Sequence, residues 1–457
     1  MRLTILGGGG FRVPLVYRAL LEDPARAVDE LTLYDTDPRR LAVIGDVLER
    51  QAQGHPAPVR VRRAESLEAA VTGADFVFSA IRVGGTAGRV RDERIPLAEG
   101  VLGQETVGAG GVLYGLRTIP VALRIAELVA ELAPRAWVIN FTNPAGMVTE
   151  AMAEVLGERV IGICDSPVGL VRRAARAAGV DGAAFAEGRV AYDYTGLNHL
   201  GWLRSLTLDG RDLLPGLLAD PAALGSFEEG RLFGAEWLAA LGALPNEYLH
   251  YYYFRRETLA SVREAAVTRG EFLDGQQGGF FARAAEAGGP EGAYALWEAT
   301  RREREETYMA ESREAGGGWQ RDACDLEGGG YDRVALALMR ALSDGADGAG
   351  GAGGADGAGG RLILNVRNGT TVPEMAPDAI VETVCEVGAG GPVPLPCAPL
   401  RADQLGLMLQ LKAVERATVE AAVRKDRAAA LRAMALHPLV DSPAVAARIL
   451  ERAAEVG

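Results

Sequence analysis

Short apolar runs alternate with amphipathic helical patterns through residues 1–165. The apolar runs predict strands at Leu3 to Leu6, Leu31 to Tyr34, Phe76 to Ala80, Trp137 to Asn140 and Val160 to Cys164. The patterns between them predict helices at Val13 to Leu21, Arg40 to Gln51, Leu116 to Leu132 and Ala145 to Leu156. Strands that alternate with helices favour a parallel, doubly wound sheet with right-handed crossovers. A ligand is then expected beyond the carboxyl ends of the strands.

The pattern changes near residue 189. A strand-like run from Arg189 to Tyr194 precedes a helical middle, and long helical stretches follow near Leu407 to Arg424 and Asp426 to Leu436. We therefore predict an α/β protein in two parts. A Rossmann-type domain spans residues 1–188, and a mixed α/β domain for catalysis and oligomerisation spans residues 189–457. Residues 344–360 are almost wholly Gly, Ala and Asp, a composition typical of a flexible loop.

Composition narrows the class of partner. The chain has 457 residues with 48% apolar content and a formal charge of -13, so it can bury a large core and repels nucleic acids and anionic membranes. A small soluble substrate is the better expectation. Neither a signal peptide nor an apolar stretch of membrane-spanning length is apparent, and Cys164, Cys324, Cys385 and Cys397 have no disulfide-framework spacing. These features predict a cytoplasmic protein.

A glycine cluster predicts the nucleotide end of the site. Gly7, Gly8, Gly9 and Gly10 directly follow the first strand and open a helix, where backbone N–H groups can approach a pyrophosphate. Asp35 ends the second strand, at the position of a carboxylate that binds the adenosine ribose, which favours NAD over NADP. A different role for Asp35, capping the helix that begins near Pro38, stays open at this point.

Two further segments carry metal-ligand chemistry. Cys164 and Asp165 lie just past the fifth predicted strand, and His199 follows a later strand. A thiolate and an imidazole suit a borderline metal such as Mn²⁺, Fe²⁺, Co²⁺ or Ni²⁺. The alternative is that Cys164 and His199 are ordinary buried residues, which the spacing alone does not exclude.

Several ordered motifs together resemble glycoside hydrolase family 4. They are Ile81-Arg82-Val83-Gly84-Gly85, Arg89 to Glu93, Gly103-Gln104-Glu105-Thr106, Asn140-Phe141-Thr142-Asn143-Pro144, Cys164-Asp165-Ser166-Pro167, Gly196-Leu197-Asn198-His199 and Tyr248-Leu249-His250-Tyr251-Tyr252. The segments Asn365 to Val372 and His437-Pro438-Leu439-Val440 are similar to the closing elements of that family. The resemblance covers nearly the whole chain and is closest to the 6-phospho-glucosidase branch.

The resemblance implies cleavage of a glycoside by transient oxidation. NAD⁺ takes hydride from C3 of the sugar, a base removes the C2 proton, and the aglycone leaves from C1; such enzymes are an exception to hydrolysis by two carboxylates. It implies that Cys164 and His199 hold a divalent metal, with Mn²⁺ expected, and that Tyr248 is the C2 base. Asp165 matches the general acid of α-acting members, whereas other motifs are closer to the 6-phospho-β-glucosidases. Anomeric preference therefore stays open.

The resemblance also implies the residues that bind cofactor and substrate. Asn140 is placed with the cofactor, Arg89 with a 6-phosphate, and Glu105 and Asn143 near the sugar hydroxyls and nicotinamide. Arg269 is a further phosphate candidate by its spacing from Tyr248. A 6-sulfonate or unphosphorylated sugar stays open as substrate, as do an NAD-dependent 2-hydroxy-acid dehydrogenase and a non-catalytic NAD(H) sensor. A homodimer or homotetramer is expected.

Overall fold

The computed structural model describes residues 1–315, 318–321, 330–343 and 360–456. Its N-terminal strands are β1 (Arg2–Leu6), β2 (Glu30–Tyr34), β3 (Arg60–Arg63), β4 (Phe76–Ser79), β5 (Trp137–Asn140) and β6 (Val160–Gly162). They are parallel and lie in the order β3-β2-β1-β4-β5-β6. This is the strand order of a dinucleotide-binding fold, so the predicted Rossmann-type sheet is confirmed.

Among the six parallel strands, β3 is the one that the apolar pattern did not predict. All four of its residues are exposed and three of them are arginine. It lies at the edge of the sheet and pairs with β2 alone. An edge strand that buries no side chain has no apolar alternation, so only its backbone pairing with β2 defines it.

The sheet continues past β6 into strands from the second half of the chain. In spatial order these are β11 (Arg361–Arg367), β12 (Ile380–Gly388), β7 (Val190–Leu197), β8 (Leu200–Leu208) and β10 (Leu244–Pro245). All these pairings are antiparallel, and β11 joins β6 where Asn365 lies opposite Gly162. Two short strands, β9 (Arg211–Asp212) and β13 (Gly391–Pro394), pair with β8 and β12. Sheet pairing is therefore continuous across both halves of the described chain.

The first half of the chain contributes eight described α-helices. They are α1 (Val13–Leu21), α2 (Pro38–Ala52), α3 (Leu67–Val71), α4 (Gly85–Ala98), α5 (Gly108–Leu132), α6 (Ala145–Leu156), α7 (Ser166–Ala177) and α8 (Gly182–Ala186). Helix α5 begins at Gly108, whereas the apolar pattern predicted a start at Leu116. The pattern missed the first turn because it is rich in glycine, which has no apolar side chain. A Cβ on Gly110 would lie 2.0 Å from the carbonyl oxygen of Gln104, so close packing selects glycine where an apolar pattern would otherwise appear.

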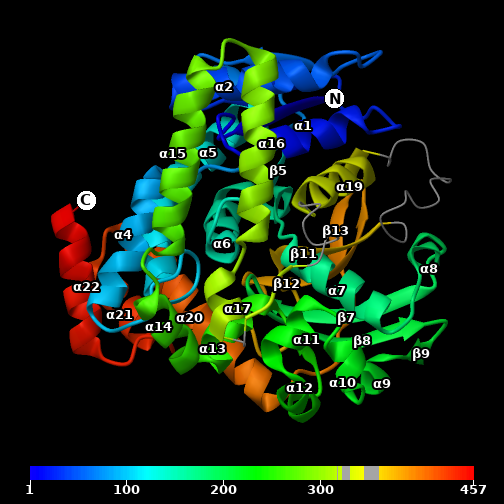
Figure 1. The fold of residues 1–457 in the computed structure, drawn as a ribbon, viewed down its shortest axis with the longest axis vertical. Helices are drawn as coiled ribbons and strands as arrows, with labels where there is room; N and C mark the ends of the chain where they lie inside the picture. The colour runs from blue at the N-terminus through cyan, green and yellow to red at the C-terminus, as the bar shows by residue number, and fades with distance from the viewer. Residues whose placement is uncertain (316–317, 322–329, 344–359, 457) are drawn as a thin grey trace.

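The second half adds helices on several sides. They are α9 (Leu214–Leu218), α10 (Pro221–Leu224), α11 (Glu228–Phe233), α12 (Ala235–Leu241), α13 (His250–Tyr253), α14 (Arg255–Glu264), α15 (Arg269–Glu286), α16 (Pro290–Glu306), α17 (Ala310–Ala315), α19 (Tyr331–Ser343), α20 (Ala402–Arg424), α21 (Arg427–Leu436) and α22 (Pro443–Val456). In Figure 1 the long helices α15 and α16 run side by side toward the N-terminal strands, and α16 packs on α2. Helix α20 packs on α5 and α6. Within the described ranges, none of these helices has the length and apolar character needed to cross a membrane.

Candidate active site

A cavity of about 930 Å³ lies beyond the carboxyl ends of the parallel strands. One end is formed by Gly7, Gly10 and Asp35, and the other by Cys164, His199 and Tyr248. Asp165, Arg89, Glu105, Asn143 and Arg269 also line it. The fold thus brings most residues predicted from the sequence to one cavity, including groups from both halves of the chain.

The glycine turn at the nucleotide end depends on Asp35. Gly7 has φ +83°, and a Cβ there would lie 2.6 Å from the carbonyl oxygen of Ala80. The Gly9 N–H donates to Oδ2 of Asp35 at 2.9 Å, while Oδ1 of Asp35 accepts from the Asp37 N–H at 3.0 Å. Asp37, and not Asp35, caps α2 by accepting from two N–H groups of its first turn. The capping role left open for Asp35 therefore belongs to Asp37.

Gly8, Gly9 and Asn140 do not line the cavity. The two glycines pack behind the turn, where a Cβ on Gly8 would lie 2.9 Å from the Leu33 side chain and one on Gly9 3.0 Å from that of Arg40. Asn140 is fully buried, and its side chain bonds to Thr142, Ala145 and Thr149 within the connection from β5 to α6. The structure therefore places Asn140 as a brace for that connection.

His199 sits in the tight turn between β7 and β8. Its backbone has φ +62°, which is uncommon for a residue with a Cβ and marks a position fixed by its surroundings. The imidazole Nδ1 lies 2.9 Å from the Thr106 hydroxyl, which leaves Nε2 for another ligand. Burial lowers the pKa of His199 to about 4, so the ring is neutral near pH 7, as a metal ligand must be. Beside it, Asn198 donates to the buried Glu382.

Cys164 lies two residues past the end of β6 and is buried. Burial and the nearby carboxyl groups of Glu382 and Asp165 raise the pKa of its thiol well above the ordinary value. A thiolate here would need a cation beside it. The described residues contain no group of three or more His, Cys, Asp and Glu side chains arranged to hold a metal. The donors Cys164 and His199 fit a borderline divalent metal whose remaining ligands are substrate or water oxygens.

Tyr248 packs directly on the predicted metal ligand. Its ring stacks on that of His199 with centroids 3.7 Å apart and an interplanar angle of 6°. The Tyr248 hydroxyl is 3.2 Å from the hydroxyl of Tyr308, which also donates to Glu247 at 3.3 Å. Burial and the neighbouring Glu247 raise the pKa of Tyr248. The phenol of Tyr248 therefore lies beside the predicted metal ligand His199. It needs a nearby positive charge to lower its pKa before it can act as a base.

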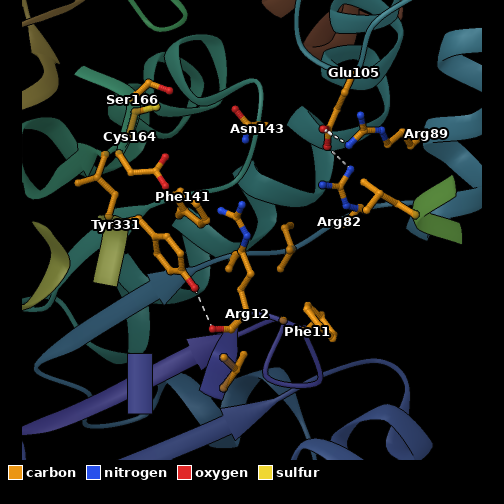
Figure 2. Close-up of a pocket in the computed structure, with 18 of the residues that line it drawn as sticks. Phe11, Arg12, Arg82, Arg89, Glu105, Phe141, Asn143, Cys164, Ser166 and Tyr331 are labelled. Carbon is orange, nitrogen blue, oxygen red and sulfur yellow. Dashed lines mark hydrogen bonds and ion pairs between the residues drawn. The ribbon is translucent and has the colours of Figure 1, made fainter. Parts of the chain in front are cut away.

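Arg89 and Glu105 form an ion-pair cluster on the opposite side of the cavity. Arg89 donates to Glu93 at 2.7 Å and to Glu105 at 2.5 Å, and Arg82 also pairs with Glu105. Burial would raise the pKa of Glu105, but Arg82 and Arg89 outweigh it and hold the pKa at about 2. Figure 2 shows Glu105 between the two arginines, across the cavity from Cys164 and Tyr331. The predicted phosphate ligand Arg89 is thus already bonded to two carboxylates.

Asn143 and Arg269 also line the cavity. Oδ1 of Asn143 is buried and lacks a hydrogen-bond partner in the described residues, so it is available to a substrate hydroxyl. Arg269 begins α15 and donates to the Thr307 hydroxyl and to the backbone carbonyl of Arg304. It ties α15 to the end of α16 at the cavity wall.

Sequence reasoning missed several cavity residues: Arg12, Glu247, Arg304 and Tyr308. Arg12 was visible only as the residue that replaces the last glycine of a strict dinucleotide motif. Glu247 precedes Tyr248, accepts from the Ser166 hydroxyl at 2.6 Å, and has its pKa raised to about 7 by burial and Glu229. Arg304 and Tyr308 had no local signal, because their place at the cavity depends on how α16 packs on α2 and α15.

Comparison with protein-family models decides the family. The model described as family 4 glycosyl hydrolase matches residues 2–180, and the model of the family 4 glycosyl hydrolase C-terminal domain matches residues 194–440. The chain belongs to glycosyl hydrolase family 4. Its membership confirms the resemblance inferred from the motifs and selects a glycoside hydrolase over the dehydrogenase and sensor alternatives.

Known family 4 proteins align along nearly the full chain. A probable 6-phospho-beta-glucosidase of Bacillus subtilis is 32% identical over 465 residues, which is 99% of this chain and 95% of the relative. The maltose-6'-phosphate glucosidase MalH of Clostridium acetobutylicum is 28% identical over 471 residues, with 99% and 97% covered. The family 4 relatives therefore include proteins named for both β- and α-linked substrates.

Solved family 4 structures share the fold. The 6-phospho-beta glucosidase from Thermotoga maritima, solved with NAD and glucose-6-phosphate, has a TM-score of 0.79 at 25% identity and covers 100% of this chain and 98% of its own. A 6-phospho-alpha-glucosidase from gut microorganisms, solved with NAD and Mn²⁺, has a TM-score of 0.77 at 25% identity, with 100% and 97% covered.

Proposed function

We propose that this family 4 enzyme cleaves a 6-phosphorylated glucoside by an oxidation and elimination sequence that uses NAD⁺ and a divalent metal, with Mn²⁺ as the first choice. The observation that carries the proposal is the shared cavity. It joins the Gly7 turn and Asp35, suited to a dinucleotide, to Cys164, His199 and Tyr248, suited to a metal and a proton transfer. The relatives solved with NAD, Mn²⁺ and glucose-6-phosphate support the same assignment.

Each residue has a stated task in this proposal. Asp35 binds the adenosine ribose, while Cys164 and His199 hold the metal. When bound, NAD⁺ supplies a hydride acceptor for C3 of the sugar, and the metal supplies Lewis acidity toward the sugar oxygens. Tyr248 removes the proton that the C3 ketone acidifies at C2, and Asp165 donates a proton to the departing aglycone. Water then adds across the double bond, with its hydroxyl at C1 and a proton from Tyr248 at C2, and the reduced cofactor, when bound, would supply the hydride that restores C3.

The mechanism leaves an isotopic mark that direct displacement at C1 does not. Reaction in D₂O should place deuterium at C2 of the released sugar, because the C2 proton exchanges with solvent before the double bond is hydrated. Hydrolysis by two carboxylates leaves that C–H bond intact. NMR of the product decides between them, and a product without C2 deuterium would overturn the proposed mechanism.

Variants separate the base from the metal ligands. Tyr248→Phe should suppress both cleavage and exchange while NADH still binds, measured by fluorescence. Tyr252→Phe is the matched control, since Tyr252 packs on His437 outside the main cavity.

Cys164→Ser and His199→Ala should each abolish activity at ordinary metal concentrations with NADH affinity nearly unchanged. Full turnover by either variant in chelator-treated buffer would contradict the metal assignment.

A further inference from the structure

A chain of hydrogen bonds joins Tyr248 to a buried carboxyl group. The Tyr248 hydroxyl lies 3.2 Å from the Tyr308 hydroxyl, which lies 3.3 Å from Oε1 of Glu247. The same Oε1 accepts from the Ser166 hydroxyl at 2.6 Å. Glu247 and Tyr248 are neighbours in the short 3₁₀ helix Glu247–Leu249, whereas Tyr308 lies just past α16 and Ser166 begins α7. Three segments far apart in the sequence therefore meet at one carboxyl group.

The hydrogens of these groups give the chain a direction. A tyrosine hydroxyl has a single hydrogen, and an ionised carboxylate can only accept. When Glu247 is ionised, Tyr308 donates its hydrogen to Glu247, so the Tyr308 oxygen is left to accept the hydrogen of Tyr248. A proton that arrives at Tyr248 can therefore be passed on by two transfers along hydrogen bonds that already exist.

Glu247 is suited to receive that proton. It lines the cavity, it is buried, and its Oε2 has no hydrogen-bond partner among the residues that the structure describes. The groups that face it are Ser166, Arg173, Glu228, Glu229, Tyr248 and Tyr308. Burial and the like charge of Glu229 raise the pKa of Glu247 to about 7, against the opposing effects of Arg173 and Ser166. A carboxyl group with such a pKa can take up and return a proton near neutral pH.

We propose that Glu247 is the final acceptor of the C2 proton and that Tyr308 relays it from Tyr248. This inference rests on the proposed function, in which Tyr248 acts at C2. The C2–H bond breaks and its proton goes to the Tyr248 oxygen, while the hydroxyl hydrogen of Tyr248 moves to Tyr308 and that of Tyr308 moves to Oε1 of Glu247. The electron pair of the C2–H bond stays in the sugar, and Glu247 changes from a carboxylate to a carboxylic acid.

The relay changes what Tyr248 requires. A tyrosine that acts by itself needs positive charge to become a phenolate, whereas the relay provides an acceptor for its hydrogen as the C2 proton arrives. The reverse transfers return a proton to C2 when the double bond is hydrated. Glu247 and Tyr308 thus act through Tyr248 and do not themselves touch the sugar in this step.

Glu247→Gln tests the relay through the sign of its effect. Glutamine keeps the size of the side chain and an oxygen that accepts hydrogen bonds, but it does not take up a proton. Turnover of a p-nitrophenyl glucoside 6-phosphate, in the anomer that the unaltered protein cleaves, should slow roughly a hundredfold. If Glu247 acted only through its charge, glutamine would have the opposite effect, because a nearby negative charge opposes ionisation of Tyr248. An unchanged or faster rate would overturn the proposal.

A double variant separates a relay from two independent effects. Tyr308→Phe breaks the link, so it should slow turnover about as much as Glu247→Gln, and the double variant should be no slower than either single variant. Losses that multiply in the double variant would overturn the relay. Tyr252→Phe, outside the cavity, and Glu303→Gln, at an exposed position of α16, are the matched controls and should keep the rate of the unaltered protein.

Isotope effects identify the step that the relay serves. Deuterium at C2 of the substrate should slow both single variants more than it slows the unaltered protein, because loss of the relay makes C2–H cleavage the slow step. NADH and glucose 6-phosphate should bind within about twofold of the unaltered affinities in calorimetry. Weaker glucose 6-phosphate binding with an unchanged C2 isotope effect would overturn the relay, since it would assign both side chains to substrate binding. A product formed in D₂O without C2 deuterium would instead contradict the proposed function itself, so the two failures are distinguishable.

Discussion

Asp35 and Asp37, two residues apart at the end of β2, divide two tasks. Asp35 accepts from the Gly9 N–H and fixes the glycine turn, while Asp37 accepts from the first N–H groups of α2. Asp35 directly follows β2 at the edge of the sheet that borders the cavity, and Asp37 directly precedes α2. Position along the chain, and not residue type, separates the side chain that fixes the glycine turn from the one that caps α2.

We predict that Asp35→Asn weakens NADH binding about tenfold or more, because it removes a charged acceptor from the adenosine ribose. Asp37→Asn should leave NADH affinity nearly unchanged, since asparagine caps a helix about as well as aspartate. Fluorescence titration of both variants is the measurement. Equal weakening by the two substitutions would show that general negative charge, and not a ribose contact by Asp35, governs the affinity.

The free energy of unfolding should depend on pH through the buried His250. His250 is fully buried, its Nδ1 is 3.1 Å from the Thr258 hydroxyl, and burial lowers its pKa to about 4. The unfolded chain has a histidine pKa of about 6.5, so it takes up the proton first, and the free energy of unfolding falls as pH drops below 6.5 toward 4. Between pH 7 and pH 5 this loss is about 2 kcal/mol from His250 alone.

His250→Phe should remove that part of the pH dependence. Phenylalanine preserves the ring that stacks on Phe254, and any constant cost of the substitution cancels when the two pH values are compared. Urea unfolding of both proteins at pH 7 and pH 5 gives the difference. An identical pH dependence in the variant would mean that the pKa of His250 does not differ between the folded and unfolded states.

At the scale of an element, the start of α5 is built for close approach. Its first residues, Gly108 to Gly111, pack under the loop that carries Glu105 and Thr106, and Thr106 in turn holds the imidazole of His199. A Cβ on Gly110 would meet both the Gln104 and the Asp92 carbonyl oxygens, at 2.0 Å and 3.0 Å. The glycines therefore fix the height of the loop above the helix and, through Thr106, the orientation of the imidazole.

Gly110→Ala should lower the free energy of unfolding by roughly 1–3 kcal/mol, because the methyl group forces the loop away from the helix. Gly406→Ala provides the opposite control: Gly406 is exposed in α20 with no neighbour in reach of a Cβ, so alanine should stabilise the protein by about 0.5–1 kcal/mol. Urea unfolding compares them. Stabilisation by both substitutions would show that the loop adjusts without cost.

Across the whole molecule, a buried ionic network links the two halves of the chain. Lys412 of α20 pairs with Glu150 of α6 at 2.7 Å and with Glu415 at 2.5 Å. Glu150 also accepts from the backbone N–H of Ile380 in β12. A helix of the first half, a strand of the extended sheet and a C-terminal helix thus meet at one carboxylate.

A homodimer or homotetramer and a cytoplasmic location stay predictions.

Lys412→Met should destabilise the protein by about 3–5 kcal/mol, because it leaves Glu415 buried without its cation and Glu150 paired with Arg416 alone. Arg424→Gln on the same helix should cost less than about 1 kcal/mol, since Arg424 is exposed and its partner Glu420 stays solvated. Denaturant unfolding measures both. Equal small effects would indicate that water enters the network and screens the two carboxylates.

Features that arise from neighbouring residues could be predicted from the order of residues along the chain. Continuous apolar strands, the glycine turn after β1 and the aspartate after β2 predicted the parallel sheet and its nucleotide end, because these signals arise from neighbouring residues. The motif set identified the family, and it placed Cys164, His199 and Tyr248 together in one expected site.

Which charges neutralise one another depends on contacts that form when the chain folds. Arg89 and Arg12 look alike in sequence, yet Arg89 meets two carboxylates and Arg12 meets aromatic faces. Arg304 reaches the cavity because α16 packs on α2 and α15, and Asn140 bonds within its own connection instead of lining the cavity. These outcomes depend on contacts between segments far apart in the chain, where electrostatic interactions are set by distance and burial, which residue order does not fix.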